Sequence, residues 1–98
     1  MFLPEEIDTL YQRFADAVYK PDVLDGKTKE LIALSNSVMA DCVPCIEHHY
    51  KKAVECGASR EEIAEAFAIA MTICAGSKRA KYASVVATLE AAAVGEKQ

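Results

Sequence analysis

Apolar residues recur at helical spacing along this chain, beginning with the segment 4–19. A repeat of about 3.6 residues there predicts an amphipathic α-helix, and Pro4 followed by two acids suits its first turn. The apolar positions are Ile7, Leu10, Tyr11, Phe14 and Val18. Pro21 and Gly26 bracket a turn, so this helix should end near Tyr19.

Two further helices are predicted on either side of a short connection. Asp25 suits the N-cap of a helix that runs to about Met39. Its inward-facing positions should be Leu31, Ile32, Leu34 and Val38. Asp41 is the expected N-cap of a third helix, which tolerates Pro44 because its first turn has no intrahelical partner for that nitrogen. Gly57 suits the left-handed residue that ends this helix.

The second half of the chain starts with another helix signal. Ser59 and Glu62 form the Ser-x-x-Glu pattern of a capping box, and the helix that it starts should run to about Ala75. After Glu65 this helix is apolar nearly all round, so it should be central or lie in a subunit interface. Its run 66–71 is the best candidate for that interface.

Gly76 and Ser77 separate that helix from a fifth, alanine-rich one over residues 78–94, and the tail 95–98 is expected to fray. The inward residues of the fifth helix should be Val85, Val86 and Leu89. No segment alternates apolar and polar residues as a strand would, and no repeat or linker divides the chain. The sequence therefore predicts an all-α fold, a small bundle of about five helices in one domain over residues 1–98.

Size and charge limit the architecture and the partners. A monomer of 98 residues and 10.6 kDa buries only about two-thirds of its surface, so association would supplement a small core. The composition, 52% hydrophobic and 27% charged, is that of a folded protein. A net charge of −4 and a pI near 5.1 argue against a phosphate-binding surface, so we expect no nucleic-acid partner.

The N-terminus and the cysteines bear on location. Glu5, Glu6 and Asp8 lie where a secretory signal would need basic residues, and the uncharged stretch 66–77 is shorter than the roughly 20 residues that span a bilayer. We therefore expect a cytoplasmic protein with no membrane partner. In a reducing compartment, four cysteines are more often catalytic or metal-binding than structural.

The segment 41–49 has the richest chemistry in the chain, because it combines a Cys-x-x-Cys pair with a histidine. At about 100° of rotation per residue, Cys45 lies about 60° from Cys42 around a helix, and His49 lies between them at about 20°. His48, at about 120°, falls outside the pair. This geometry suits a dithiol/disulfide couple that has its own base.

A helix N-terminus and a nearby protonated histidine both lower the pKa of a thiol, and both are predicted here. Such a base needs a third group to orient it, and Glu30 on the preceding helix is the candidate. Cys45, one turn before His49, is the expected attacking thiol, and Cys42 would resolve the sulfenic acid or mixed disulfide. The product would be a Cys42–Cys45 disulfide.

A metal site is the main alternative for these residues. Cys42, Cys45 and His49 would give three zinc ligands, with Glu30 as a fourth. Structural zinc cysteines usually come in two separated pairs, however, and this chain has one pair at a helix start. A thioredoxin-like domain shares the motif but requires a βαβ context, which the sequence lacks.

The remaining candidate groups have simpler interpretations. We expect Cys56 and Cys74 to be small buried hydrophobic residues, and His48 to be solvated or in an interface. The basic cluster Lys78, Arg79 and Lys81 is best explained as a solvated helix start, and a site for an acidic thiol substrate is the alternative.

Glu30 is followed, after eleven residues, by Cys42-x-x-Cys45, and His49 comes after three more residues. This order, in an all-helical domain, resembles the carboxymuconolactone decarboxylase and alkylhydroperoxidase D family over residues 24–92. The resemblance implies a proton relay from the glutamate and histidine to the cysteines. It also implies reduction of small-molecule disulfides or hydroperoxides. The subunits would assemble as trimers or hexamers. The redox cycle itself requires an external thiol or reductase as electron donor, because the chain contains no flavin or nicotinamide signature, and we expect no bound cofactor.

One position departs from that family pattern. Well-studied alkylhydroperoxidases of the family have a second histidine between the cysteines, where this chain has Pro44. Proline cannot transfer a proton, so the resemblance favours dithiol–disulfide exchange over strong peroxidase activity. The decarboxylase that gives the family its name lacks the cysteine pair, which makes decarboxylation the less favoured alternative.

Overall fold

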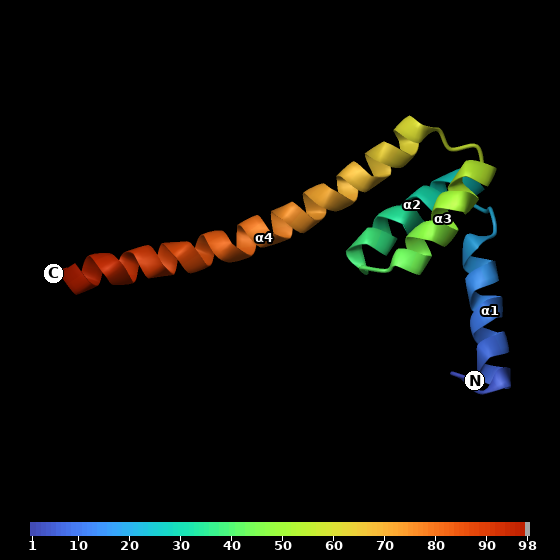
Figure 1. Ribbon diagram of the computed structural model, residues 1–98, viewed down its shortest axis with the longest axis horizontal. Coiled ribbons are helices and arrows are strands. Elements are labelled where there is room, and N and C mark those ends of the chain that lie inside the picture. Colours follow the sequence, from blue (N-terminus) through green and yellow to red (C-terminus); the bar gives the residue numbers. More distant parts are fainter. Residues whose placement is uncertain (98) are drawn as a thin grey trace.

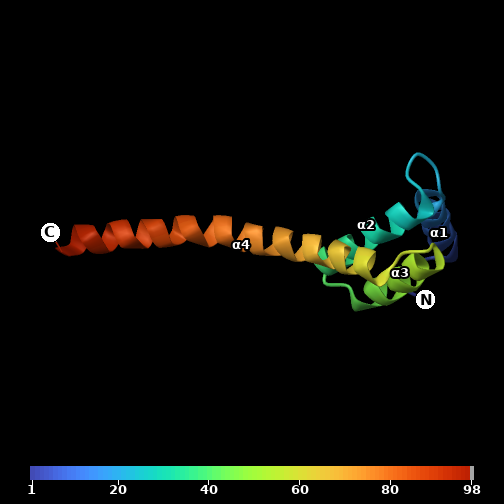
Figure 2. The same ribbon diagram turned by 90° about the horizontal axis from the view of Figure 1, so that it is seen from above.

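The computed structural model describes residues 1–97, and over that range it contains α-helices and no strands, which confirms the all-α prediction. The helices are α1 (Glu5–Tyr19), α2 (Gly26–Met39), α3 (Val43–Glu55) and α4 (Arg60–Lys97). Figure 1 shows α2 and α3 as an antiparallel pair, with the first half of α4 packed across α2. The second view shows α1 at one end of this body and the rest of α4 extending from the other (Figure 2).

The core lies where α2, α3 and the start of α4 meet. Leu34 is fully buried there and packs with Ala53 and Ile63. The partly buried residues around them are Leu31, Ile46, Ala58 and Phe67. Burial of a leucine side chain stabilises a fold by about 1.5–3 kcal/mol, so this cluster holds the three helices together.

Three of the predicted helix boundaries are confirmed by their capping contacts. The side chain of Asp25 accepts a hydrogen bond from the Thr28 N–H (2.7 Å) at the start of α2. Ser59 and Glu62 exchange the reciprocal bonds of a capping box, at 3.0 and 2.9 Å. Gly57 adopts φ 89° and ends α3, a conformation that glycine reaches without steric cost.

The prediction that Asp41 caps α3 is wrong. Asp41 adopts φ 52° and belongs to the end of α2, where its N–H donates to the Val38 carbonyl and the Cys42 N–H donates to the Ser37 carbonyl. These two bonds form the Schellman motif, in which one residue must enter the left-handed region, and aspartate tolerates it better than most residues. Cys42 is therefore the N-cap of α3.

The predicted break at Gly76 is also wrong, because α4 continues from Arg60 to Lys97 and the described chain has four helices. A glycine inside a helix costs only about 1 kcal/mol relative to alanine, and no proline follows to stop the helix. The tail predicted to fray is helical to Lys97, and Gln98 lies outside the described residues. Within residues 1–97, no helix is both long and apolar enough to cross a bilayer.

The predicted inward faces are only partly correct. Leu34 is fully buried in α2, and Ala66 and Ala70 of the predicted interface run pack inside the chain. The apolar faces of α1 and of the far half of α4 are largely exposed.

Candidate active site

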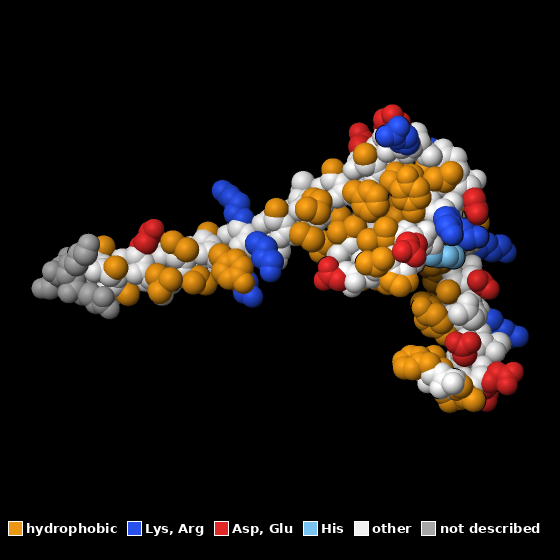
Figure 3. All heavy atoms as spheres, in the orientation of Figure 1, with side chains coloured by type: hydrophobic (Ala, Val, Ile, Leu, Met, Phe, Trp, Pro, Cys, Tyr) orange, Lys and Arg blue, Asp and Glu red, His pale blue; other side chains and the backbone are white. Residues whose placement is uncertain are grey.

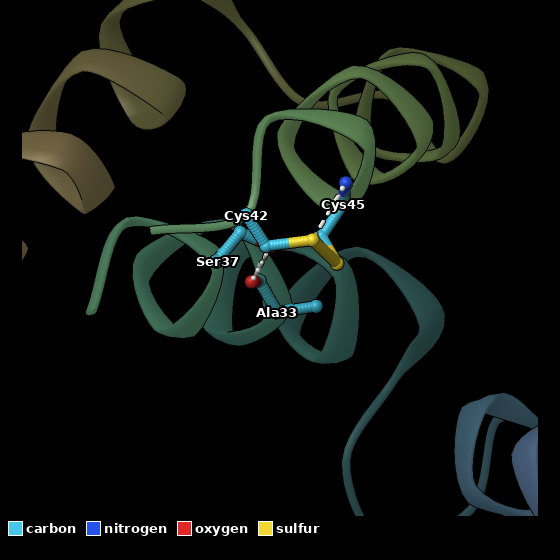
Figure 4. The surroundings of a disulfide bond; sticks show 4 residues. All are labelled: Ala33, Ser37, Cys42 and Cys45. Carbon is cyan, nitrogen blue, oxygen red and sulfur yellow. Dashed lines mark hydrogen bonds between the residues drawn. A yellow bond between two sulfur atoms is a disulfide. The ribbon is translucent and has the colours of Figure 1, made fainter. Parts of the chain in front are cut away.

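The two cysteines of the Cys-x-x-Cys motif lie at the start of α3 and form a disulfide. Cys42 is the N-cap, and its Sγ accepts a hydrogen bond from the Cys45 N–H at 3.2 Å. Pro44 occupies the first turn of α3, where backbone N–H groups have no acceptor within the helix, so its missing N–H costs no hydrogen bond. Figure 4 shows the disulfide beside Ala33 and Ser37 of α2. The positive end of the α3 dipole thus points at both sulfurs, which favours a thiolate once the bond is reduced.

Glu30 and His49 meet across the α2–α3 interface. His49 Nδ1 lies 2.6 Å from Glu30 Oε2, and the two side chains are 12% and 8% exposed. An ionised carboxylate can only accept, so Nδ1 carries the hydrogen and Nε2 is the nitrogen that can exchange a proton. His49 is one turn after Cys45 on α3, where side chains four residues apart are neighbours.

Tyr19, at the end of α1, covers the His49 ring. The two ring centroids are 4.9 Å apart and the planes are tilted by 41°. Burial, and then the negative charge of Glu30, raise the pKa of Tyr19 above its ordinary value, so the phenol stays neutral at physiological pH. Sequence analysis missed this residue, because its place over His49 depends on the turn between α1 and α2 and not on any motif.

Lys29 holds the end of α1 in that position. Its Nζ donates to the carbonyl oxygens of Val18 (2.7 Å) and Lys20 (2.6 Å), which lie at the C-terminus of the helix. A cation there satisfies carbonyls that have no helical partner and matches the negative end of the helix dipole. Lys29 therefore fixes Tyr19 relative to α2, on which Glu30 lies.

Two grooves open beside Cys45, His49 and Tyr19, and all three residues line both of them. The first groove, of about 430 Å³, is largely apolar, and its other lining residues include Val18, Leu24, Ile32, Ala33 and Ala40. The second, of about 820 Å³, lies between α1 and α3 and includes Tyr11, His48, Lys52 and Cys56. Cys42 lines neither groove, so a molecule in either one reaches Cys45 first.

Of the other candidate residues, His48 and Cys56 line the second groove, and Cys74 lines neither groove. His48 is exposed, as expected, and its ring meets the His49 ring edge-on at 4.9 Å. The prediction that Cys56 is buried is wrong, because it caps the C-terminus of α3 at the surface. Cys74 is partly buried, and its Sγ lies 3.4 Å from the Met39 Sδ.

The basic cluster Lys78, Arg79 and Lys81 lies on the extended half of α4, away from the disulfide (Figure 1). Lys78 and Lys81 lie within 6 Å of the Tyr82 ring, at 5.9 and 5.6 Å from its centroid. The cluster is therefore not part of the site of its own chain.

The zinc alternative requires a cluster of ligands, and the structure shows none among the residues that it describes. No group of three or more His, Cys, Asp and Glu side chains is arranged there to hold a metal ion. The two cysteine sulfurs are bonded to each other, and Glu30 is paired with His49.

Comparisons with known proteins identify relatives of this chain. The model of the carboxymuconolactone decarboxylase family matches residues 5–89. A protein of Paracoccus denitrificans, called uncharacterized protein 4 in cox locus, is 34% identical over 84 residues, which cover 86% of this chain and 76% of that protein.

Solved structures from two other organisms share the fold. A protein from Methanobacterium thermoautotrophicum is 32% identical, with a TM-score of 0.75 over 82% of this chain and 90% of its own. A carboxymuconolactone decarboxylase family protein from Thermotoga maritima, suggested to be involved in the antioxidative response, is 35% identical. Its TM-score is 0.71 over 97% of this chain and 98% of its own.

Proposed function

Because the chain belongs to the carboxymuconolactone decarboxylase family, we propose that it is a thiol–disulfide oxidoreductase in which Cys42 and Cys45 are the redox couple. The observation that carries this proposal is the Cys42–Cys45 disulfide at a helix N-terminus, one turn from a histidine paired with a buried glutamate. The antioxidative role suggested for the Thermotoga maritima relative supports the same class of chemistry.

In the reduced protein, His49 Nε2 takes the proton of the Cys45 thiol, and Glu30 holds the imidazole in the required tautomer. The Cys45 thiolate attacks one sulfur of a substrate disulfide and forms a mixed disulfide, which releases the first thiol with the proton from His49. Cys42 then loses its proton and attacks Sγ of Cys45, and the second thiolate leaves and takes up that proton as a thiol. The substrate gains two electrons, and the cysteines lose two as their disulfide forms.

Cys45 is the attacking residue in this scheme because it lines both grooves and Cys42 lines neither. The largely apolar lining of the first groove suits a small organic disulfide. Cys42, held by its N–H bond to the Ser37 carbonyl, resolves the intermediate. An external thiol or reductase, in a reducing cytoplasm, restores the dithiol, and the sulfurs themselves carry the electrons without a bound cofactor.

A hydroperoxide is a second, slower substrate of the same centre. The Cys45 thiolate would cleave the O–O bond, release an alcohol and become a sulfenic acid, from which Cys42 would displace water. The leaving alkoxide needs a proton, and His49 is the donor at hand, because Pro44 has none to give. We therefore expect disulfide reduction to exceed peroxide reduction.

A turnover assay with a small aliphatic disulfide and an alkyl hydroperoxide tests this function. Cys45→Ser should abolish both activities, and Cys74→Ser, a change at a cysteine of α4 that lines neither groove, should leave them at the parent level. Cys42→Ser should accumulate the mixed disulfide on Cys45. Full reductase activity in Cys45→Ser would overturn the mechanism.

The decarboxylase and zinc alternatives are tested on the same samples. A decarboxylase would turn over a lactone acid with both Cys42 and Cys45 replaced by serine, whereas the proposed reductase would not. A zinc protein would retain stoichiometric metal after purification and lose helicity in a chelator.

A further inference from the structure

Two exposed apolar stripes remain without a partner in the single chain. The α1 stripe consists of Ile7, Leu10, Tyr11, Phe14 and Val18, which are each 44–66% exposed. The α4 stripe consists of Tyr82, Val85, Val86, Leu89 and Ala93, and its four large residues are 46–63% exposed. Figure 3 shows hydrophobic side chains along both helices. Stripes of this kind on a soluble protein mark interaction surfaces.

The two stripes have the same spacing. In each, the members fall at the first position and then three, four, seven and eleven residues later. That pattern makes a single apolar band along one side of a helix, of the width that helices bury against another element. Both bands are about 17 Å long at 1.5 Å per residue, so one can cover the other along its full length.

The surface area of the chain shows how much remains to be covered. The chain exposes 7860 Å², whereas a compact domain of its mass exposes about 5,500 Å². Its radius of gyration is 20.2 Å, against about 13 Å for a compact domain of this length. The surplus exceeds the roughly 800 Å² that each partner buries in a standard interface. α1 has no buried residue of its own, which makes it the element in greatest need of a partner.

The charges around the stripes are complementary. The α1 helix carries Glu5, Glu6, Asp8 and Asp16 against one arginine, Arg13. Residues 78–94 of α4 carry Lys78, Arg79 and Lys81 against one acid, Glu90. Opposite net charges favour the encounter of these two surfaces and disfavour pairing of either helix with its own copy.

We propose that the α1 stripe of one chain packs on the α4 stripe of a second copy, with the two helices parallel. The partner must be another chain because α1 and the far half of α4 extend to opposite sides of the molecule (Figure 1). Parallel packing places Glu5 and Glu6 beside the basic cluster and Arg13 toward Glu90. Antiparallel packing would instead bring Lys20 to the basic cluster and the acidic end of α1 to Glu90.

This pairing joins two different surfaces, so it closes either reciprocally between two chains or around a ring. It also reaches the candidate active site. α1 ends at Val18 and Tyr19, which line the groove beside Cys45, so the second copy would fix one wall of that groove.

Size-exclusion chromatography with light scattering on the chain of residues 1–98 tests the pairing. The parent should have a mass that is a multiple of one chain. Phe14→Glu in the α1 stripe and Leu89→Glu in the α4 stripe should each elute as a monomer with unchanged helicity. Ala91→Glu adds the same charge to the opposite face of α4 and should keep the parent mass. A monomeric parent, or parent-like mass in both stripe variants, would overturn the proposal.

Mixing the two stripe variants separates loss of pairing from misfolding. Phe14→Glu keeps an intact α4 stripe and Leu89→Glu keeps an intact α1 stripe, so the mixture should form a species of higher mass than either variant alone. A mixture that stays monomeric would contradict the pairing of these two stripes.

Charge reversal tests the direction of the helices. Glu5→Lys with Glu6→Lys should weaken the assembly, and adding Lys78→Glu with Lys81→Glu should restore it. Weakening without restoration would refute the parallel arrangement.

Discussion

His49 Nδ1 lies 2.6 Å from Glu30 Oε2, although the two residues are 19 positions apart and belong to different helices. The contact gives a buried carboxylate its partner and leaves Nε2 as the exchangeable nitrogen of the imidazole. Because His49 follows Cys45 by one helical turn, the α2–α3 pair connects a buried acid to the Cys42–Cys45 disulfide. The proposed chemistry depends on this connection.

Loss of the imidazole should slow the thiolate-forming step. We expect His49→Ala to reduce the rate of disulfide reduction by about 100-fold or more at neutral pH, as for other positioned bases. The difference should shrink at alkaline pH, where the Cys45 thiol ionises unaided. A pH–rate profile identical to that of the parent would remove His49 from the mechanism. Lys51→Ala, at an exposed residue of the same helix that lines neither groove, is the matched control and should keep parent kinetics.

Glu30 should act through His49 rather than on the substrate. Glu30→Gln keeps the shape and a hydrogen-bonding oxygen but removes the charge, so it should lower the reduction rate less than His49→Ala does. Adding Glu30→Gln to His49→Ala should cost little more, because both changes interrupt one relay. Independent, multiplicative losses in the double variant would show that the two residues do not act as a unit.

Tyr19 should contribute its ring and not its hydroxyl. Burial and the Glu30 charge raise its pKa, so the phenol neither charges nor exchanges a proton near neutral pH. Tyr19→Phe should therefore keep both the rate and its pH dependence, and Tyr19→Ala should lower the rate by uncovering His49. Equal losses in the two variants would assign a role to the hydroxyl.

The core predicts a clear stability effect. Leu34 is fully buried between α2, α3 and α4, so Leu34→Ala should lower the free energy of unfolding by about 2–5 kcal/mol. Ile32→Ala, on the same helix but 46% exposed, should cost less. Urea unfolding at one protein concentration compares the two. A larger loss for Ile32→Ala would place the core elsewhere.

Acid should weaken the contact between α2 and the start of α4. The hydrogen bond from Lys27, at 2.8 Å, and that from the Ser59 N–H hold the pKa of Glu62 below its ordinary value. A carboxylate with a lowered folded-state pKa stabilises the fold above its unfolded pKa, and this contribution is lost as the pH falls through the folded value. The urea midpoint of Glu62→Gln should thus change less than that of the parent between neutral and acidic pH.

Local signals predicted most helix ends, because a cap is a contact between residues three or four positions apart. Asp25, Gly57 and the Ser59–Glu62 box are examples. The role of Asp41 is ambiguous in sequence because aspartate suits both an N-cap and a left-handed C-terminal residue, and only the carbonyls of α2 distinguish the two. Gly76 resembles a helix break in sequence because a lone glycine carries no sign of how strongly its neighbours favour the helix.

The candidate site was predictable where one helix contains it and not where helices meet. The Cys45–His49 spacing is a property of α3 alone, and Glu30 could be proposed because a short connection folds α2 back on α3. Tyr19 and Lys29 escaped prediction because their contacts depend on the angle between α1 and α2, which no motif encodes.

The central claim is that Cys42 and Cys45 exchange electrons with a substrate disulfide, and a stoichiometric thiol count tests it most directly. The fully reduced protein should have four free thiols. After reaction with a small aliphatic disulfide it should keep two, those of Cys56 and Cys74, and peptide mapping should locate the new bond between Cys42 and Cys45. Retention of all four thiols, or oxidation at Cys56 and Cys74 instead, would contradict the account.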